Sequence, residues 1–490
     1  MKSSQQKIGT SRRSTLALAA GSVAATAMPI RSIHASETES DVLIIGAGLS
    51  GLNAALLLEE SGAKVTILEG RERIGGRLYT LTDVPGAPEA GGSVIGPLYA
   101  RVLDYADRLE LTLEPMRARE PIEIPLDQQA EKTLLHLGGQ AIKTPEWEHS
   151  KSNPFPDHLK SVLPFFFRNP AIAPLNTLKD IESWLEPEAA SLDVSLYELL
   201  NRNGYATNAI NMGIDINQSY GNSSHDVSAL HLLQNQTWGQ HQSQGSGVFH
   251  IKGGNQSLPK AMAKTVRGDI HMNTRAHSIT HDSDGVTVAT DDGTIHKARF
   301  VLVSLPFSAL RLLKIDPPLA GQQGAAVATL GYSTTTQLHF SIERPYWEDD
   351  GLPPNMWTDQ FCGQLLAYAH GDNGEITSAC VWLSGKNALR ADRLSDDVLT
   401  HEVLASLVAI RPSTKGALKP IRTWSWQKDQ FAGGTWCSWK PGQISNFANV
   451  MAKPAGRIHF SGEHTARLDR GMEGALESGE RAAFEIMERL

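Results

Sequence analysis

The sequence predicts an α/β fold that begins with a Rossmann-like unit, and three observations indicate it. An apolar run over residues 41–45 is typical of a buried parallel strand. A glycine-rich turn over residues 46–51 follows at once, and residues 53–60 then have a helical pattern. A second apolar run over residues 64–68 ends at Glu69. This order of strand, turn, helix, strand and acid is typical of a dinucleotide site, whereas the glycines alone would indicate only a turn.

The residues of this turn suit the binding of a pyrophosphate. Gly46 permits the tight turn, Gly48 lets the backbone approach the phosphates, and Gly51 lets the helix pack closely on the strand. The N-terminus of the helix carries a partial positive charge that attracts the phosphates. Glu69 would accept hydrogen bonds from the hydroxyls of an adenosine ribose. The expected contacts from this region are Gly46, Gly48, Leu49, Ser50, Gly51, Glu69, Gly70 and Arg71.

Composition and charge exclude several classes of protein. The chain has 490 residues, of which 41% are hydrophobic and 20% are charged, so it is neither collagen-like, coiled-coil nor wholly disordered. With 45 Lys and Arg against 53 Asp and Glu, the net charge is −8, which argues against a nucleic-acid partner. Three cysteines, Cys362, Cys380 and Cys437, argue against a disulfide framework. The histidines show no metal-ligand spacing, so no metal site is expected.

Residues 1–35 are expected to be a twin-arginine export signal. The segment is basic and without acids, and Arg12 and Arg13 precede a run of small and apolar residues from Leu16 to Met28. That run is shorter than the roughly 20 residues that span a bilayer. We therefore expect a periplasmic protein, exported in its folded state and without a membrane anchor; a basic tail without an export role is the alternative.

Two further glycine segments extend the predicted site. In the first, residues 71–77, Gly75 and Gly76 are flanked by arginines, so that backbone amides and guanidinium groups can close over a second part of a long cofactor. A basic surface turn is the plain alternative. The second segment, residues 91–97, reads Gly-Gly-Ser-Val-Ile-Gly-Pro and offers another close approach of the backbone.

With these motifs the sequence resembles the flavin-dependent amine oxidases, specifically the monoamine oxidase branch. The resemblance extends to the C-terminus, where Gly462-Glu463 and Met472-Glu473-Gly474 are similar to the family's final strand and helix. It implies a Rossmann-like FAD-binding domain and a discontinuous substrate-binding domain of mixed sheet and helices. The expected FAD-binding segments are 36–112, 248–315 and 420–490, and the expected substrate-binding segments are 113–247 and 316–419.

The resemblance also implies which residues contact FAD. The amide of Met472 would donate toward the pyrimidine carbonyl of the flavin, where a helix N-terminus stabilises the charge of the reduced ring. Thr435 stands where mitochondrial relatives have the cysteine that bonds the flavin, so FAD is expected to be non-covalent. The further expected contacts are Gly76, Arg77, Gly91, Gly92, Ser93, Val94, Ala276, Gly462, Glu463, Gly471 and Met472.

The activity that the resemblance implies is oxidative deamination of an amine. Hydride passes from the α-carbon of the amine to flavin N5, and the imine is hydrolysed to an aldehyde or ketone plus ammonia or an amine. Trp436 matches one wall of the family's aromatic cage, which favours the neutral amine through its low polarity. Gly471 replaces the opposite aromatic wall, so a wider pocket and a bulky or branched amine are expected.

Gln337 is the third residue expected to act in catalysis. It stands where the family usually has a lysine that holds a water at flavin N5 and promotes the reaction with oxygen. A neutral amide would not stabilise superoxide, so oxygen is expected to be a poor acceptor. Either O2 or a periplasmic redox protein such as a cytochrome would then reoxidise the flavin. The protein is expected to be a homodimer or a monomer.

Further expectations concern the substrate domain and the competing functions. Residues 225–230 are expected to belong to the helix that shapes the substrate cavity, with His231 and Trp238 lining it, and residues 155–174 to form an entrance loop. An L-amino acid oxidase or dehydrogenase is one alternative function, although Val94 stands where several such enzymes have a carboxylate-binding arginine. Arg117 lies elsewhere and is expected at the surface. A desaturase-type oxidoreductase on the same fold is a second alternative, and a non-catalytic flavoprotein is a third.

Overall fold

The structure is a computed structural model that describes residues 39–115, 133–218, 220–245, 247–370 and 375–490. The predicted export signal and Arg117 lie outside the described residues. Residues 36–490 form one compact unit. Among the described helices, none combines the length and the apolar character that crossing a bilayer requires.

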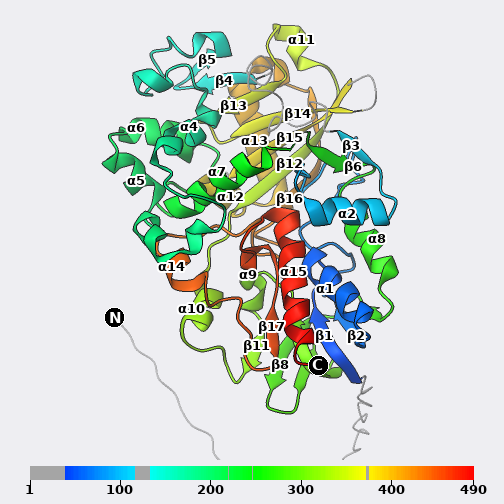
Figure 1. The fold of residues 1–490 in the computed structure, drawn as a ribbon. Helices are drawn as coiled ribbons and strands as arrows, with labels where there is room; N and C mark the ends of the chain where they lie inside the picture. The colour runs from blue at the N-terminus through cyan, green and yellow to red at the C-terminus, as the bar shows by residue number, and fades with distance from the viewer. Residues whose placement is uncertain (1–38, 116–132, 219, 246, 371–374) are drawn as a thin grey trace, which may run out of the picture. The chain divides into compact units, whose positions relative to one another are not determined.

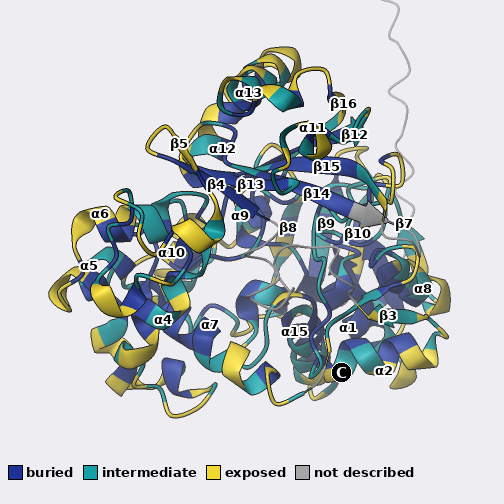
Figure 2. Ribbon diagram, turned by 90° about the horizontal axis from the view of Figure 1, so that it is seen from above, coloured by how far each residue is buried: buried dark blue, intermediate teal, exposed yellow. Residues whose placement is uncertain are grey.

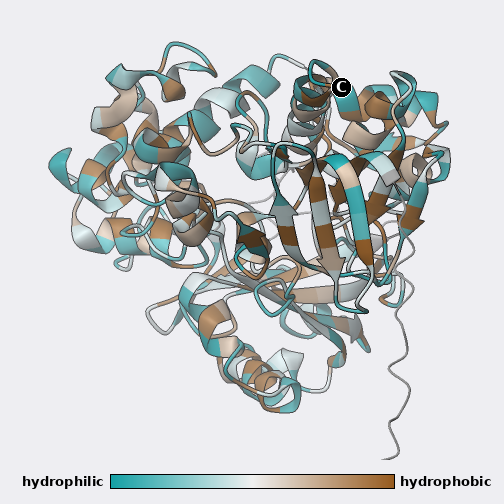
Figure 3. Ribbon diagram, turned by 90° about the horizontal axis from the view of Figure 1, so that it is seen from below, coloured by the Kyte–Doolittle hydropathy of each residue, from teal (hydrophilic) through white to brown (hydrophobic). Residues whose placement is uncertain are grey.

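The first sheet contains the predicted Rossmann-like unit (Figure 1). It has eight strands among the described residues. Seven of them have the order β11-β8-β9-β10-β1-β2-β7, and the eighth, β17, pairs with β10. The central strand β1 runs parallel to β2 and β10, with Ile44 opposite Ile67 and Leu302. The strands are β1 (Glu39–Ile45), β2 (Val65–Leu68), β7 (Asp269–His271), β8 (Ala276–His281), β9 (Val286–Thr290), β10 (Ile295–Val303), β11 (Lys314–Asp316) and β17 (Ile458–Phe460). Figure 3 shows hydrophobic stretches along strands of this sheet, as expected of strands buried between layers.

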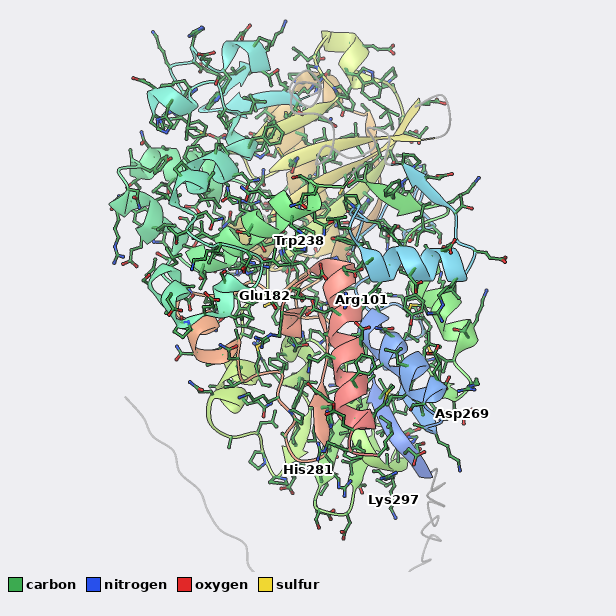
Figure 4. All side chains as sticks on the ribbon, viewed as in Figure 1. Arg101, Glu182, Trp238, Asp269, His281 and Lys297 are labelled. Carbon is green, nitrogen blue, oxygen red and sulfur yellow. The ribbon has the colours of Figure 1, made fainter. Side chains whose placement is uncertain are left out.

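Two helices pack side by side on this sheet. Helix α15 (Gly471–Met487), red in Figure 1, lies along α1 (Leu49–Glu60), and Asn53 donates to the carbonyl of Leu476 at 2.7 Å. A Cβ at Gly479 would lie 2.3 Å from the carbonyl oxygen of Ser50, so the two backbones could not approach this closely with a larger residue. The helices α2 (Ala100–Arg108) and α8 (Ser257–Thr265) lie near them. Arg101 of α2 reaches α15 (Figure 4), where it donates to Glu473 at 3.1 Å.

The second sheet belongs to the other half of the compact unit. Its seven described strands have the order β16-β12-β15-β14-β13-β4-β5. Helix α13 (Asp396–Ile410) covers part of it with Leu399, Val403 and Leu407, while its outer side is exposed (Figure 2). The strands are β4 (Thr133–Leu137), β5 (Gln140–Ile142), β12 (Thr335–Ile342), β13 (Asn355–Thr358), β14 (Gln364–His370), β15 (Glu375–Ser384) and β16 (Leu418–Ser425).

Helices and turns fill the rest of this half. The entrance segment expected at residues 155–174 is a series of short helical turns that includes α4 (Arg168–Ile172). A short antiparallel pair, β3 (Leu113–Pro115) and β6 (Phe249–Ile251), forms a third sheet. The remaining helices are α5 (Leu196–Arg202), α6 (Thr207–Ile210), α7 (Ala229–Gln242), α9 (Phe307–Leu310), α10 (Gly321–Thr329), α11 (Tyr346–Asp350), α12 (Gly385–Ala391) and α14 (Gln443–Phe447).

Two expected boundaries differ from the structure. The cavity helix α7 begins at Ala229 rather than at residue 225, because the side chain of Ser228 caps it by accepting from the amide of His231. Strand β16 continues to Ser425 and pairs with β12, so residues 420–425 belong to the second sheet and not to the segment expected in the FAD-binding domain. The other domain boundaries stay a prediction.

Candidate functional site

One connected cavity of about 1480 Å³ lies at the carboxyl ends of the central strands. Its wall includes the turn after β1, the end of β2, residues 91–94 and the start of α15. Ligand pockets typically measure roughly 300–1,000 Å³, so this cavity has room for a long ligand and a second, smaller one. The position is that of ligand sites in open α/β sheets.

The glycine-rich turn forms a close-fitting part of the wall. Gly46 has φ of +108°, and a Cβ there would lie 2.8 Å from the carbonyl oxygen of Ser304. A Cβ at Gly51 would lie 2.1 Å from the carbonyl oxygen of Gly46, so this glycine is required for packing, and it does not line the cavity. A Cβ at Gly48 would meet no protein atom within 4 Å, because Gly48 faces the open cavity. Leu49 and Ser50 line the cavity at the start of α1.

Glu69 is buried at the end of β2 and is held from two sides. Its Oε2 accepts from the amide of Ala47 at 2.9 Å, and its Oε1 accepts from the amide of Arg71 at 2.8 Å. Arg71 in turn pairs with Asp429 at 2.8 Å. Glu69, Gly70 and Arg71 line the cavity, and so does Ala276 at the start of β8. The carboxylate is therefore fixed before any ligand binds.

Arg77 connects three of the predicted segments. Its guanidinium donates to Glu463 at 2.8 Å and to the carbonyl of Thr435 at 2.7 Å. Burial opposes the charge, but the ion pair with Glu463 outweighs it and raises the pKa of Arg77. A Cβ at Gly76 would contact only the Cα of Gly48, at 3.5 Å, so two glycine segments face each other across the cavity wall. Gly76, Arg77, Gly462 and Glu463 all line the cavity.

The loop of Gly91, Gly92, Ser93 and Val94 lines the cavity beside Arg77, whose carbonyl accepts from the amide of Gly92 at 3.3 Å. A Cβ at Gly91 would lie 1.9 Å from the carbonyl oxygen of Arg77, so only glycine fits there. Asn255 holds the loop in place because its side-chain amide donates to the carbonyls of Gly92 at 3.0 Å and Ser93 at 2.7 Å. Asn255 is fully buried and is a positioning residue that sequence reasoning did not identify.

Helix α15 starts at the cavity. Met472 lines the wall in its first turn, where the positive end of the helix dipole faces the cavity. Gly471 has φ of +57°, and a Cβ there would contact only the hydroxyl of Tyr99, at 3.7 Å. The wall is thus open at Gly471, and Tyr99 and Trp238 lie nearby with their ring centroids 5.9 Å apart. Figure 4 labels Trp238 near the start of α15.

Trp436 lines the cavity within a larger group of rings, called here the aromatic cluster, which consists of Tyr99, Tyr220, His231, Trp238 and Trp436. The rings of Tyr220 and Trp436 lie 5.6 Å apart, and those of Tyr220 and His231 also lie 5.6 Å apart. Burial, and then the charges of Arg470 and Arg168, lower the pKa of His231 well below its usual value. His231 is therefore neutral at physiological pH.

Gln337 does not line the cavity, in contrast to its expected place beside the flavin ring. Its side chain is fully buried in β12 and is occupied internally. The amide nitrogen donates to the carbonyl of Ala90 at 3.1 Å, and the amide oxygen lies 2.9 Å from Nε2 of His339. Ala90 itself lines the cavity, so Gln337 lies one residue behind the wall.

Two cavity arginines were not identified from the sequence. Arg168 of α4 and Arg470 before α15 both place their guanidinium carbons 5.0 Å from the ring centroid of Tyr220. Arg470 also donates to the hydroxyl of Tyr220. Burial alone would raise the pKa of Tyr220, but the two guanidinium groups outweigh it and lower the pKa. The position of Arg470 directly before the Gly471-Met472 motif was a signal that could have identified it. For Arg168 the sequence offers no signal beyond its place in the entrance segment.

The residues present fit a bound dinucleotide. Gly48 and Gly76 leave open backbone on the cavity side, while Glu69 and the starts of α1 and α15 supply the acceptor and the positive helix ends that such a ligand needs. Of the residues expected to contact FAD, all but Gly51 line the cavity. A dinucleotide cradle that opens into an aromatic and cationic chamber fits an oxidoreductase that uses a dinucleotide cofactor.

The chain belongs to the family of flavin containing amine oxidoreductases, which it matches over residues 49–487. FAD is the cofactor of this family, and the protein is an FAD-dependent amine oxidase. It is 26% identical over 477 residues to amine oxidase [flavin-containing] B of Cavia porcellus, with 92% of this chain and 86% of the relative covered. It is also 26% identical over 478 residues to the Bacillus subtilis protein named "Putative L-amino-acid oxidase YobN", with 93% and 96% covered.

Solved structures show the same fold. A putrescine oxidase bound to putrescine has a TM-score of 0.73 at 23% identity, with 92% of this chain and 100% of that chain covered. The cyclohexylamine oxidase of Brevibacterium oxydans has a TM-score of 0.73 at 22% identity, with 92% and 99% covered. The expected combination of a Rossmann-like domain with a mixed substrate domain is thereby confirmed.

Proposed function

We propose that the protein oxidises a small amine at the carbon that bears the nitrogen, with the amine held against the aromatic cluster beside Trp436. One observation carries this proposal: a single cavity connects the glycine cradle to the aromatic cluster, so a cofactor and a substrate can lie in contact. FAD, when bound, accepts the two electrons and the hydrogen that the amine loses. The resulting imine then reacts with water to give an aldehyde or ketone and ammonia or an amine.

The residues of the chamber would favour the reactive, neutral form of the amine. Trp436, Trp238 and Tyr99 exclude water and lower the local polarity, which disfavours an ammonium ion. Arg168 and Arg470 add positive charge that disfavours it further. The neutral His231 is available for a hydrogen bond to the amine, as donor or acceptor according to its tautomer, since its Nε2 has no partner among the described residues. These groups orient and desolvate the substrate, and the cofactor supplies the redox chemistry.

FAD is proposed to be held without a covalent bond. Thr435 lines the cavity, and its hydroxyl donates to the carbonyl of Ser333 at 3.0 Å. Cys437 also lines the cavity, but burial raises the pKa of its thiol well above the usual value, so it stays protonated and a poor nucleophile. Acid precipitation of the holoenzyme should leave the yellow colour in the supernatant; a yellow pellet would contradict this proposal.

The acceptor is proposed to be O2 or a periplasmic redox protein, with O2 the slower of the two. No lysine is found among the described residues that line the cavity, so the family's usual lysine beside the ring has no counterpart there. We also propose export by the twin-arginine route, on the basis of Arg12 and Arg13 alone. Mixing of the reduced enzyme with air or with a cytochrome would compare the two acceptors; faster reoxidation by air would contradict this order.

The proposed function is tested by mixing the holoenzyme with a panel of amines in the absence of oxygen. The flavin absorption should be bleached by at least one amine, with formation of the corresponding aldehyde or ketone. Bleaching only by compounds that lose hydrogen from two adjacent carbons would favour the desaturase alternative. A flavin that dithionite reduces but that no organic substrate bleaches would favour the non-catalytic alternative.

A further inference from the structure

The two cavity arginines have no acidic partner of their own. Among the described residues, no carboxylate forms an ion pair with Arg168 or Arg470. Two acids that also line the cavity are engaged elsewhere: Asp469 contacts Arg101 at 3.6 Å, and Glu463 pairs with Arg77 at 2.8 Å. Charge held in a cavity without a counter-charge is costly, so these two half-buried guanidinium groups favour an anionic ligand.

The polar contacts of both guanidinium groups are few. Arg470 donates to the hydroxyl of Tyr220 and lies over the ring of Trp238 at 5.2 Å. Arg168 donates from Nε to the side chain of its neighbour Asn169 at 3.3 Å. An arginine has five N–H donors, so with only these hydrogen bonds to the described residues most donors of the pair remain for a ligand. Burial, and then the positive charge of Arg470, lower the pKa of Arg168, as expected of two neighbouring cations.

The location of this cationic pair points to the substrate rather than to the cofactor phosphates. Arg470 directly precedes Gly471 and Met472, where α15 begins. Both arginines contact Tyr220, whose ring centroid lies 5.6 Å from that of Trp436. The phosphate-binding features, by contrast, are at the turn after β1, which is formed by residues 46–51. An anion bound by Arg168 and Arg470 would therefore lie beside the amine.

We propose that the substrate is an amine that also carries a carboxylate, and that Arg470 and Arg168, with the hydroxyl of Tyr220, bind that carboxylate. This inference rests on the proposed function, since it names the substrate class of the same chamber. A carboxylate matches the planar fork of a guanidinium group and supplies the missing negative charge. The position beside Trp436 and Gly471 suits an α-amino acid or a short ω-amino acid, in which the two groups are close together.

The first test is binding of an anion that cannot be oxidised. Benzoate and its neutral isostere benzamide are titrated into the oxidised holoenzyme and followed by calorimetry and by the flavin spectrum. Benzoate should bind at least about tenfold more tightly than benzamide, and Arg470→Gln and Arg168→Gln should each remove most of that preference. The matched control is Arg467→Gln, because Arg467 is exposed and lies outside the cavity wall. Arg470→Lys, which keeps the charge but not the fork, should retain part of the preference.

The second test compares matched substrates. Phenylalanine is paired with 2-phenylethylamine, and 5-aminopentanoate with pentylamine, which separates α- from ω-amino acids. For the preferred pair, kcat/KM should favour the carboxylate-bearing member, and Arg470→Gln should lower that ratio at least about tenfold. Equal binding of benzoate and benzamide, or a ratio unchanged by both arginine substitutions, would overturn the inference while leaving amine oxidation intact. If no compound of either kind bleaches the flavin, the proposed function itself fails, whatever benzoate does.

Discussion

The carboxylate of Glu69 accepts a hydrogen bond from the amide of Ala47 at 2.9 Å, so the acid after β2 fixes the turn after β1. The two residues are 22 positions apart in the sequence and meet because β1 and β2 are adjacent and parallel. A carboxylate offers about four acceptor sites. The amides of Ala47 and Arg71 use two of them, which leaves capacity for a ligand in the cavity.

The substitution Glu69→Gln should weaken FAD binding. It removes the charge that strengthens the bond from Ala47 and any bond to a ribose hydroxyl, and bonds of this kind contribute about 1.5–3 kcal/mol each. The dissociation constant of FAD, measured by reconstitution of the apoprotein, should rise at least about tenfold. The control is Glu60→Gln, because the side chain of Glu60 is 62% exposed. Equal dissociation constants for the two variants would contradict the role given to Glu69.

Gly48→Ala should affect the holoenzyme and not the empty protein. Gly48 has φ of −83°, and an added Cβ would meet no protein atom within 4 Å, so the apoprotein should melt at an unchanged temperature. In the holoenzyme the same methyl group would project into the space of the cofactor, so the stabilisation by added FAD should shrink. Gly239→Ala, on the exposed side of α7, is the matched control and should keep the full FAD-dependent shift. A full shift in Gly48→Ala would show that the cofactor does not lie there.

Trp436→Leu should act mainly on the chemical step, which is reduction of the flavin by the amine, and less on the stability of the fold. Trp436 contributes a wall of the chamber and contacts Tyr220, while its Nε1 makes no hydrogen bond among the described residues. Loss of this wall should loosen the position of the amine, and we expect the anaerobic rate of flavin reduction to fall at least about tenfold. Trp347→Leu serves as the control, because Trp347 packs on Tyr346 outside the cavity and should change the melting temperature instead.

The free energy of unfolding should decrease as the pH falls from 6.5 to 4, because buried histidines resist protonation. Burial, with a smaller effect of Arg422, lowers the pKa of His339 from 6.5 to about 4. Below pH 6.5 the unfolded chain binds a proton at His339 that the folded protein does not bind. The free energy of unfolding therefore decreases as the pH falls to about 4. The loss from His339 is about 3 kcal/mol, at 1.36 kcal/mol per pKa unit. His231 and His464, whose pKa values burial also lowers well below normal, act in the same direction.

Denaturant titrations at several pH values measure this effect at saturating FAD. His339→Gln removes one titrating group and should make the decrease shallower across that range. A variant whose stability changes with pH as steeply as that of the wild type would exclude His339 as a contributor.

Among the residues that line the cavity, those of the first βαβ unit could be predicted from local spacing, whereas the distant ones were expected only through the resemblance to the amine oxidases. The turn of residues 46–51 and the acid at Glu69 belong to one βαβ unit, whose spacing reflects fixed geometry. Gln337 was misplaced because a strand position in the sequence does not reveal which neighbour takes up the side chain, and here Ala90 and His339 do. The arginine pair was missed because Arg168, Tyr220 and Arg470 converge from three distant segments, and no local pattern indicates that they meet.

The central claim is that one cavity holds FAD and an amine in contact, and anaerobic titration of the holoenzyme tests it most directly. With the best substrate of the panel, one equivalent of amine should bleach one equivalent of FAD and release one equivalent of carbonyl product. Full retention of the yellow colour with every amine, in a protein whose FAD dithionite reduces normally, would contradict the account.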